Sequence, residues 1–330
     1  MDENASATQK RVPSSESPVP QLAFIFPGQG SQSVGMLAEL AAAHAHVRET
    51  FEEASQGAGR DLWALAQDGP GEELNRTENT QPALLATSVA VWRVWCTQGG
   101  AMPAQMAGHS LGEYSALVCA GALSLHDAAG LVAERGRLMQ DAVPAGVGAM
   151  AAILGGDDAQ IAMVCDEVAQ GEVIAPANFN SPGQVVIAGH AAAVDRAIAR
   201  LAELGVRKAV KLAVSVPSHT ILMRDAANRL GERMAQIQWK VPSVPVVQNA
   251  DARAHTSVEY IRAALERQLY MPVRWTECVQ QLATNGATKL FECGPGRVLT
   301  GLAKRIDKAL EARALGTPAE LEQALAASLG

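Results

Sequence analysis

The hydrophobic positions of the chain fall into short apolar runs separated by longer stretches with helical periodicity. The run Gln21–Phe26 (QLAFIF) has the length of a buried strand and leads into the Gly-rich loop GQGSQ. Residues 102–107 form a second such run, which GHSLGEYSAL follows as a turn and a helix. Between them, residues 82–95 predict a helix with a broad apolar face, and the polar segment 56–80 is expected to cross the surface.

A change of rhythm after residue 145 predicts a second, smaller unit. Strand-like and helix-like stretches follow one another there in the order β-α-β-β-α-β, at residues 147–154, 157–169, 173–177, 184–188, 191–204 and 207–214. That order is the split βαβ arrangement of a ferredoxin-like domain. We therefore expect a ferredoxin-like small domain over residues 146–215.

Beyond the small domain the chain alternates again between helices and strands. Helices are predicted at 220–236, at 257–269 and from 298 onward, and strands at 244–249 and 289–292. Such alternation predicts a parallel sheet with helices on both faces.

The domain organisation follows from these patterns. We expect a large α/β domain of residues 21–145 and 216–330, interrupted by the ferredoxin-like insertion at 146–215. The Ser- and Pro-rich residues 1–20 predict a disordered N-terminal extension.

Composition and charge exclude several classes of function. Hydrophobic residues make up 48% of the 330-residue chain and charged residues 18%, which supports a large buried core. Aromatic residues are 4%, the formal net charge is −7, and no run is rich in Lys and Arg, so nucleic acid is not an expected partner. The chain has no apolar run near the roughly 20 residues of a membrane span and no N-terminal secretory signal. We therefore expect a cytoplasmic protein that does not bind membranes.

The cysteines offer no metal site. They form no CxxC pair and have no metal-like spacing with histidine: Cys96, Cys119, Cys165, Cys278 and Cys293. Each lies in an apolar stretch, which is typical of a buried thiol in a reducing compartment.

The strongest chemical signal is the pattern G-x-S-x-G at residues 108–112, between a predicted strand and a predicted helix. A nucleophile elbow requires that context, and it predicts an α/β-hydrolase-like large domain. The backbone N–H of Leu111 would then point to where an oxyanion forms beside Ser110. The alternative is a Gly-rich turn in which Ser110 only caps the helix, but the strand–turn–helix context favours the nucleophile.

A serine nucleophile needs a base to remove its proton. His219, in SVPSH, begins a helix after a strand and is the candidate, whereas His109 is expected to point away from its neighbour Ser110. The other histidines are expected to be structural or on the surface: His44, His46, His126, His190 and His255. No acid stands out as the third member of a triad, so either a distant acid or a carbonyl orients the base.

A series of motifs extends this picture along most of the chain. FPGQGSQ, QPALL, GHSLGEYSAL, RGxxM, NFNSPGQVVIAG, SVPSH, RQLYMPVRW and GPG occur in this order. The set resembles the malonyl-CoA:acyl carrier protein transacylases of bacterial fatty-acid synthesis, and the resemblance spans residues 21–312. It implies that Ser110 is acylated, that His219 is its base, and that the amides of Leu111 and Gln29 form the oxyanion hole.

The resemblance also implies roles for two residues outside the elbow. Arg135, the first residue of RGxxM, would hold the free carboxylate of the malonyl group, while Arg137 would lie on the surface. Gln268, in RQLYMPV, would offer its backbone carbonyl to the second ring nitrogen of His219 in place of an acid. Because the carbonyl is a main-chain atom, only the shape of the Gln268 side chain is expected to matter.

The implied reaction transfers malonyl from malonyl-CoA to the phosphopantetheine thiol of acyl carrier protein by a ping-pong mechanism through a malonyl-serine ester, with no cofactor and no metal. Arg207, Lys208 and Lys211 are the predicted docking patch for the acidic carrier, and the enzyme is expected to be a monomer. Two alternatives remain at this point: a hydrolase with the same elbow, and a carrier-binding scaffold that has lost catalysis.

Overall fold

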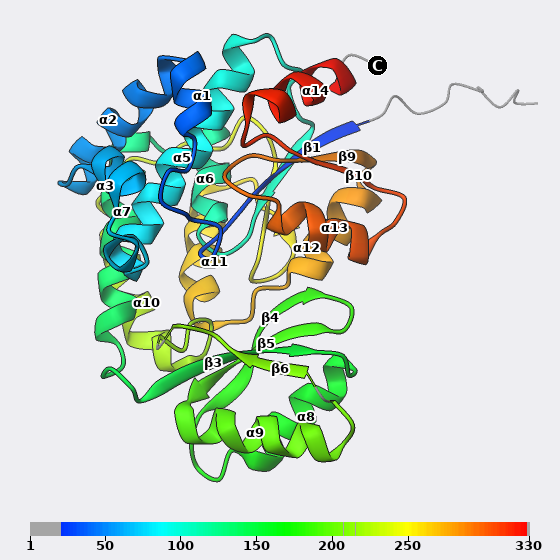
Figure 1. Cartoon of the computed structure of the whole chain (residues 1–330). Coiled ribbons are helices and arrows are strands. Elements are labelled where there is room, and N and C mark those ends of the chain that lie inside the picture. Colours follow the sequence, from blue (N-terminus) through cyan, green and yellow to red (C-terminus); the bar gives the residue numbers. More distant parts are fainter. Residues whose placement is uncertain (1–20, 207, 215, 329–330) are drawn as a thin grey trace, which may run out of the picture.

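The computed structural model describes residues 21–206, 208–214 and 216–328. It is an α/β protein with one mostly parallel sheet and one antiparallel sheet. In Figure 1 the antiparallel sheet and its helices form the green lower part, and the parallel sheet lies above it. The predicted fold class is confirmed. The expected N-terminal extension at residues 1–20 lies outside the described residues, as does Arg207.

The larger sheet has the strand order β10-β9-β1-β2-β7-β8. Its strands are β1 (Gln21–Phe26), β2 (Gln105–Gly108), β7 (Val246–Gln248), β8 (Arg253–Ala254), β9 (Ala287–Glu292) and β10 (Glu311–Ala314). Neighbouring strands run parallel except for β7 and β8, which are antiparallel. Because β1, β2 and β7 are parallel neighbours, the loops at their carboxyl ends open at the same edge of the sheet.

Helices on both faces enclose this sheet. They are α1 (Ala38–Ala43), α2 (His46–Ala58), α3 (Leu62–Asp68), α4 (Gly71–Leu74), α5 (Thr77–Thr97), α6 (Gly112–Cys119), α7 (Leu125–Asp141), η1 (Ile221–Met223), α10 (Arg224–Met234), α11 (Val258–Tyr270), α12 (Trp275–Thr284), α13 (Val298–Ile306) and α14 (Pro318–Ser328).

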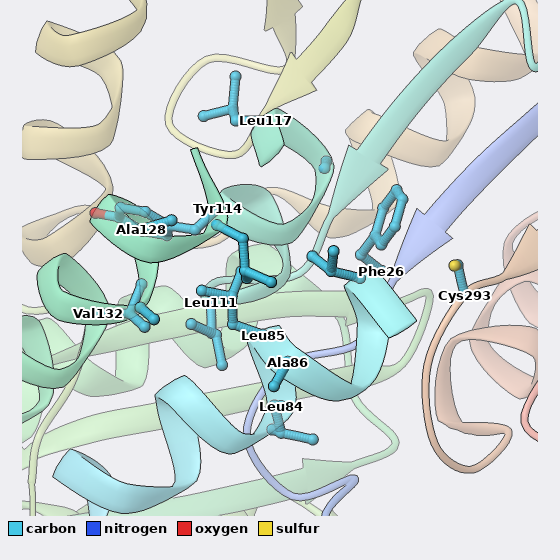
Figure 2. Close-up of a cluster of buried hydrophobic side chains, with 14 of the residues drawn as sticks. Phe26, Leu84, Leu85, Ala86, Leu111, Tyr114, Leu117, Ala128, Val132 and Cys293 are labelled. Carbon is cyan, nitrogen blue, oxygen red and sulfur yellow. The ribbon is translucent and has the colours of Figure 1, made fainter. Parts of the chain in front are cut away.

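Alternate residues of β1 contribute to separate cores on the two faces. Phe24 and Phe26 pack in the cluster that includes α5 and α7, whereas Ala23 and Ile25 pack in the cluster that includes α12 and α13. Figure 2 draws part of the first cluster, with side chains from α5, α6, α7 and β1 gathered around Leu111. Successive side chains of a strand face opposite sides of its sheet, so β1 is buried from Leu22 to Phe26 and its carboxyl end is held rigidly.

The structure corrects several boundaries. The polar segment 56–80 does not simply cross the surface: it forms α3, α4 and the first turn of α5, anchored by buried Leu62 and Leu74. The helix expected from 298 onward ends at Ile306, and β10 and α14 follow it. We did not predict α12, although its buried residues recur at helical spacing: Trp275, Cys278, Val279 and Leu282.

The smaller sheet has the strand order β4-β5-β3-β6, with every pair antiparallel. It contains β3 (Gly148–Leu154), β4 (Ile174–Ser181), β5 (Gln184–His190) and β6 (Lys208–Lys211), with α8 (Asp158–Val168) and α9 (Ala191–Glu203) packed on one face. The element order is the predicted ferredoxin-like one. Strand β4 is hydrogen-bonded directly to the segment between α11 and α12. Phe179 N–H donates to Val273 O and Val273 N–H donates to Ala177 O, both at 2.9 Å.

Candidate active site

Ser110 lies in the turn between β2 and α6, in a left-handed backbone conformation with φ of 50°. The turn brings backbone segments so close that side chains cannot be accommodated at its glycines. A Cβ on Gly108 would lie 1.9 Å from the carbonyl carbon of Gly112, and one on Gly112 would lie 2.0 Å from Phe26 O. The Ser110 N–H donates to Asn249 Oδ1 at 2.8 Å, which fixes the turn against the end of β7. The G-x-S-x-G pattern therefore has the steric cause that an elbow requires.

His219 lies beside Ser110, just before η1, and is also left-handed with φ of 61°. Its Nε2 is 2.9 Å from Ser110 Oγ and its Nδ1 is 2.7 Å from Gln268 O. A carbonyl oxygen can only accept, so Nδ1 carries the ring proton and Nε2 accepts from the Ser110 hydroxyl. The group that faces Nδ1 is thus a main-chain carbonyl rather than an acid.

The surroundings keep the His219 ring neutral. Burial, followed by the charge of Arg135, lowers the pKa of His219 from 6.5 to about 3, although the bond to Gln268 O opposes this shift. A ring with so low a pKa is unprotonated at neutral pH and is available to accept a proton.

Arg135 lies on α7 with only 1% of its surface exposed. Its Nη1 donates to Gln81 Oε1 at 2.7 Å, and its Nη2 donates to Gln268 Oε1 at 2.9 Å and to Ser110 Oγ at 3.2 Å. Among the described residues, its Nε–H has no hydrogen-bond partner. Burial lowers the pKa of Arg135, and the nearby Tyr114 and Glu113 act in the opposite direction. A buried guanidinium beside a nucleophile, held by neutral amides, is a site for an anionic group.

A cavity of about 370 Å³ unites these groups, and Ser110, His219 and Arg135 all line it. Gln29 and Leu111 line it too, and their backbone N–H groups donate to no acceptor in the described part of the chain. Gln29 follows β1 and Leu111 follows β2, so the adjacent parallel strands bring both amides to the same cavity. Two such donors can stabilise a developing oxyanion.

The side chain of Gln268 does more than fill space, so the expectation that only its shape matters is wrong. Its Oε1 accepts from Arg135, and its Nε2 donates to Ser110 O at 2.9 Å and to Glu113 Oε2 at 3.2 Å. The residue is fully buried behind the cavity. Both its main chain and its side chain therefore contact the residues that line the site.

Sequence reasoning also missed residues that meet the site from distant segments. His109 lines the same cavity, and its Nε2 is 2.7 Å from Asn180 Oδ1 on β4. Asn249 holds the Ser110 turn from the end of β7. The position of His109 next to the nucleophile was a usable signal, whereas nothing local in the sequence pointed to Asn180 or Asn249.

Two of the three residues of the predicted docking patch are described, and they precede a residue that lines the cavity. Lys208 and Lys211 are on β6, and Leu212, which follows that strand, lines the cavity. Lys211 Nζ forms an ion pair with Asp195 at 2.5 Å, which leaves Lys208 as the more available cation of the two. Over residues 21–206, 208–214 and 216–328, no group of His, Cys, Asp and Glu could hold a metal ion. Within the same ranges, the helices are too short or too polar to cross a membrane.

The fold and these groups are those of an acyl-transferring enzyme, and comparison with known proteins agrees. The family model of the acyl transferase domain matches residues 23–313. The protein is an acyltransferase. A malonyl CoA-acyl carrier protein transacylase of Salmonella typhimurium is 60% identical over 305 residues, which cover 92% of this chain and 99% of the relative. The Bacillus subtilis protein of the same name is 44% identical over 92% of this chain and 96% of its own.

Solved structures give the same result. The malonyl-CoA:acyl carrier protein transacylase of Xanthomonas oryzae is 67% identical, with a TM-score of 0.93 over 94% of this chain and 98% of its own. A malonyl-transacylase solved in complex with its type II polyketide acyl carrier protein is 56% identical, with a TM-score of 0.92 over 93% of this chain and 99% of its own. The chain belongs to the malonyl CoA-acyl carrier protein transacylase family.

Proposed function

We propose that this enzyme transfers malonyl from malonyl-CoA to the phosphopantetheine thiol of an acyl carrier protein, by a ping-pong mechanism through a malonyl ester of Ser110. The names of its relatives support the substrate pair, and the relative solved with its carrier protein supports the partner. The product would supply fatty-acid chain elongation. No cofactor is needed, because each step uses only protein groups and the two thioesters.

In the first half-reaction, the Ser110 hydroxyl gives its proton to His219 Nε2 as Oγ attacks the thioester carbonyl carbon. The 2.9 Å contact between these atoms supports direct transfer. The amides of Leu111 and Gln29 stabilise the oxyanion. The C–S bond then breaks, and the departing coenzyme A sulfur takes the proton from His219.

In the second half-reaction the carrier thiol takes the place of coenzyme A. His219 removes the thiol proton, the sulfur attacks the ester carbonyl, and the C–O bond to Ser110 breaks. The proton returns to Ser110 Oγ, which restores the resting enzyme. Gln268 O keeps the same His219 nitrogen available as acceptor and donor in both halves.

The observation that carries the choice of malonyl is the buried guanidinium of Arg135, 3.2 Å from Ser110 Oγ. Malonate keeps an ionised carboxylate at neutral pH, and burying that charge without a partner would be costly. A guanidinium matches a carboxylate with two parallel hydrogen bonds. A generic ester hydrolase has no use for such a cation beside its nucleophile, which makes the hydrolase the weaker alternative.

Substitution of Arg135 tests this assignment. Charge-assisted hydrogen bonds are worth about 1.5–3 kcal/mol each, so Arg135→Ala should lower malonyl transfer by roughly a few orders of magnitude. Transfer of acetyl should be retained or improved, because a neutral acyl group gains nothing from the cation. Arg137→Ala, an exposed residue of the same helix, is the matched control and should change neither rate. An unchanged malonyl-to-acetyl preference in Arg135→Ala would overturn the assignment.

The enzyme acts as a cytoplasmic monomer, with a catalytic domain of residues 21–145 and 216–330 and a small domain of residues 146–215. The carrier docks beside Lys208 and Lys211, next to the cavity that Leu212 lines. Arg207 belongs to the proposed patch by sequence alone.

A further inference from the structure

A buried carboxylate lies behind the site and takes no part in the proposed chemistry. Glu113 is in the first turn of α6, shortly after Ser110, and is fully buried. Its Oε1 accepts from Gln248 Nε2 at 2.8 Å, and its Oε2 accepts from Asn249 N at 2.8 Å and from Gln268 Nε2 at 3.2 Å. Each of these donors in the described part of the chain is a neutral amide. A buried charge without a direct ion pair is costly and calls for a reason.

Two of the residues that donate to Glu113, Asn249 and Gln268, also contact the residues of the site. Asn249 Oδ1 accepts from Ser110 N, and Asn249 Nδ2 donates to Gly108 O at 2.7 Å, so Asn249 fixes both sides of the elbow. Gln268 Oε1 accepts from Arg135 Nη2 at 2.9 Å, and Gln268 Nε2 donates to Ser110 O at 2.9 Å. Glu113 is therefore linked to the elbow and to the guanidinium through one intervening residue each.

The orientation of the Gln268 amide depends on Glu113, because an ionised carboxylate can only accept hydrogen bonds. An amide side chain can rotate by 180° and exchange its oxygen and nitrogen. Glu113 and the Ser110 carbonyl both require the Gln268 NH₂, so the Gln268 oxygen must face Arg135, which can only donate. In the opposite orientation the Gln268 NH₂ would face the guanidinium, and Arg135 would lose that acceptor.

We infer that Glu113 is a positioning residue, which orients the Gln268 amide and thereby holds the Arg135 guanidinium where it can receive the carboxylate of the acyl group. This inference rests on the proposed role of Arg135. The amide also separates Glu113 from Arg135, so the two charges attract each other without forming a direct pair that would occupy the guanidinium. The cation remains charged and available to the substrate.

The ionisation of Glu113 is consistent with this role. Burial raises the pKa of Glu113 to about 7, while its hydrogen bonds from Gln248, Asn249 and Gln268 and the charge of Arg135 act to lower it. At pH 8 most molecules therefore carry the acceptor-only carboxylate, which makes that pH suitable for a test.

The test compares two buried glutamates. Glu113→Gln keeps the size of the side chain but places an NH₂ group among the donors. Glu292→Gln makes the same change at a second fully buried carboxylate, which accepts from Leu299 N, Thr300 N and Thr300 Oγ1 and does not line the cavity. Acylation with malonyl-CoA and with acetyl-CoA is measured at pH 8 for both variants, alongside thermal unfolding.

For Glu113→Gln we expect about a tenfold loss of kcat/KM with malonyl-CoA, mostly through KM, because the loss corresponds to one weakened charge-assisted bond. Acetyl transfer should change less, so the malonyl-to-acetyl preference should fall. Glu292→Gln should keep that preference whatever its stability. Equal preferences in wild type and Glu113→Gln would overturn the inference.

A second variant covers the case in which Glu113→Gln does not fold. Gln268→Leu keeps the main-chain carbonyl for His219 and removes the amide between Glu113 and Arg135, so it should show the same loss of malonyl preference. A retained preference in Gln268→Leu overturns the inference. Arg135→Ala in the same assay distinguishes a failure of the proposed function from a failure of this inference alone. If Arg135→Ala retains the malonyl-to-acetyl preference, both fail. If only Arg135→Ala loses the preference, the inference alone fails.

Discussion

Two turns at the carboxyl edge of the parallel sheet lead from a buried strand into a helix, and they differ in the acceptors of their backbone N–H groups. At the end of β9, Glu292 accepts from the backbone N–H groups of Leu299 and Thr300, so the chain fills the positive end of α13 with its own carboxylate. At the end of β2, the N–H of Leu111 donates to no acceptor within the described residues, and it faces the cavity. We call the first the closed turn, because these N–H groups find their acceptor within the chain. We call the second the open turn, because the N–H of Leu111 is the one proposed to bind the oxyanion.

The two buried glutamates differ in the same way. Glu292 caps a helix, which is a structural task. Glu113 accepts instead from residues outside its own helix, including Asn249, which follows β7, and Gln268 of α11. The Leu111 N–H that has no acceptor among the described residues, the left-handed Ser110 and the buried guanidinium of Arg135 are each unfavourable for folding, and together they form the proposed site.

The largest effect on the open turn should come from the base. His219→Ala should slow formation of the acyl-enzyme by about 10²–10⁴-fold, because general-base catalysis contributes that much. Single-turnover mixing with malonyl-CoA measures it. The corresponding loss in Glu113→Gln should be smaller, since a main-chain carbonyl orients His219. If substitution of any carboxylate slowed acylation as much as His219→Ala does, that carboxylate would be the third member of a catalytic triad.

The closed turn should respond in stability rather than in rate. Glu292→Gln replaces a carboxylate that accepts from Leu299 and Thr300, and hydrogen bonds to charged groups are worth about 1.5–3 kcal/mol. We expect the free energy of unfolding in urea to fall by about 2 kcal/mol, with an unchanged rate of acylation. A rate loss in the folded variant would mean that the two turns are not functionally distinct.

A smaller effect is expected from the surface beside the cavity. Lys208→Glu together with Lys211→Glu should raise the KM for carrier protein by a few-fold, roughly, and flatten its dependence on salt, because screening weakens attraction between exposed charges. Acylation by malonyl-CoA should not change. Lys304→Glu with Lys308→Glu makes an equal change of charge at other exposed residues and serves as the control. Equal damage to both half-reactions would show that Lys208 and Lys211 serve coenzyme A or the fold.

The smallest expected change is in the protonation of His219. Since its pKa is lowered to about 3 in the folded protein, its ring should remain neutral from pH 8 down to pH 5. The unfolded chain takes up that proton near pH 6.5, so this group lowers folding stability as the pH falls from 6.5 towards 3. Imidazole nitrogen chemical shifts of the folded protein report the protonation directly. A titration of His219 near pH 6.5 would contradict the buried, neutral base.

The parts of the molecule that depend on local pattern could be predicted from the sequence. The turn at Ser110 is contiguous, with glycines that permit close approach, and the β-α-β-β-α-β order of the small unit is continuous along the chain. The fold class is confirmed for the same reason. The three boundary errors arose where amphipathic signals were weak or overlooked, as in α12.

The contacts behind the site could not be predicted, because they join distant segments. Glu113 meets Asn249 and Gln268 across more than a hundred residues of sequence, and no spacing rule relates them. A glutamate in the first turn of a helix is ordinarily a favourable surface residue, so its burial had no local signal. The orientation of the Gln268 amide, in turn, depends on Arg135, Glu113 and the Ser110 carbonyl together.

Intact-protein mass measurement after mixing with malonyl-CoA tests the central claim most directly. The wild-type protein should gain the mass of one malonyl group, located on the peptide that contains Ser110, and should lose it when carrier protein is added. Ser110→Ala should gain nothing. Absence of any adduct in the wild type would favour a scaffold without catalysis, and loss of the adduct to water alone would favour a hydrolase. An adduct that persists in Ser110→Ala, for example on Cys119, would contradict the serine mechanism.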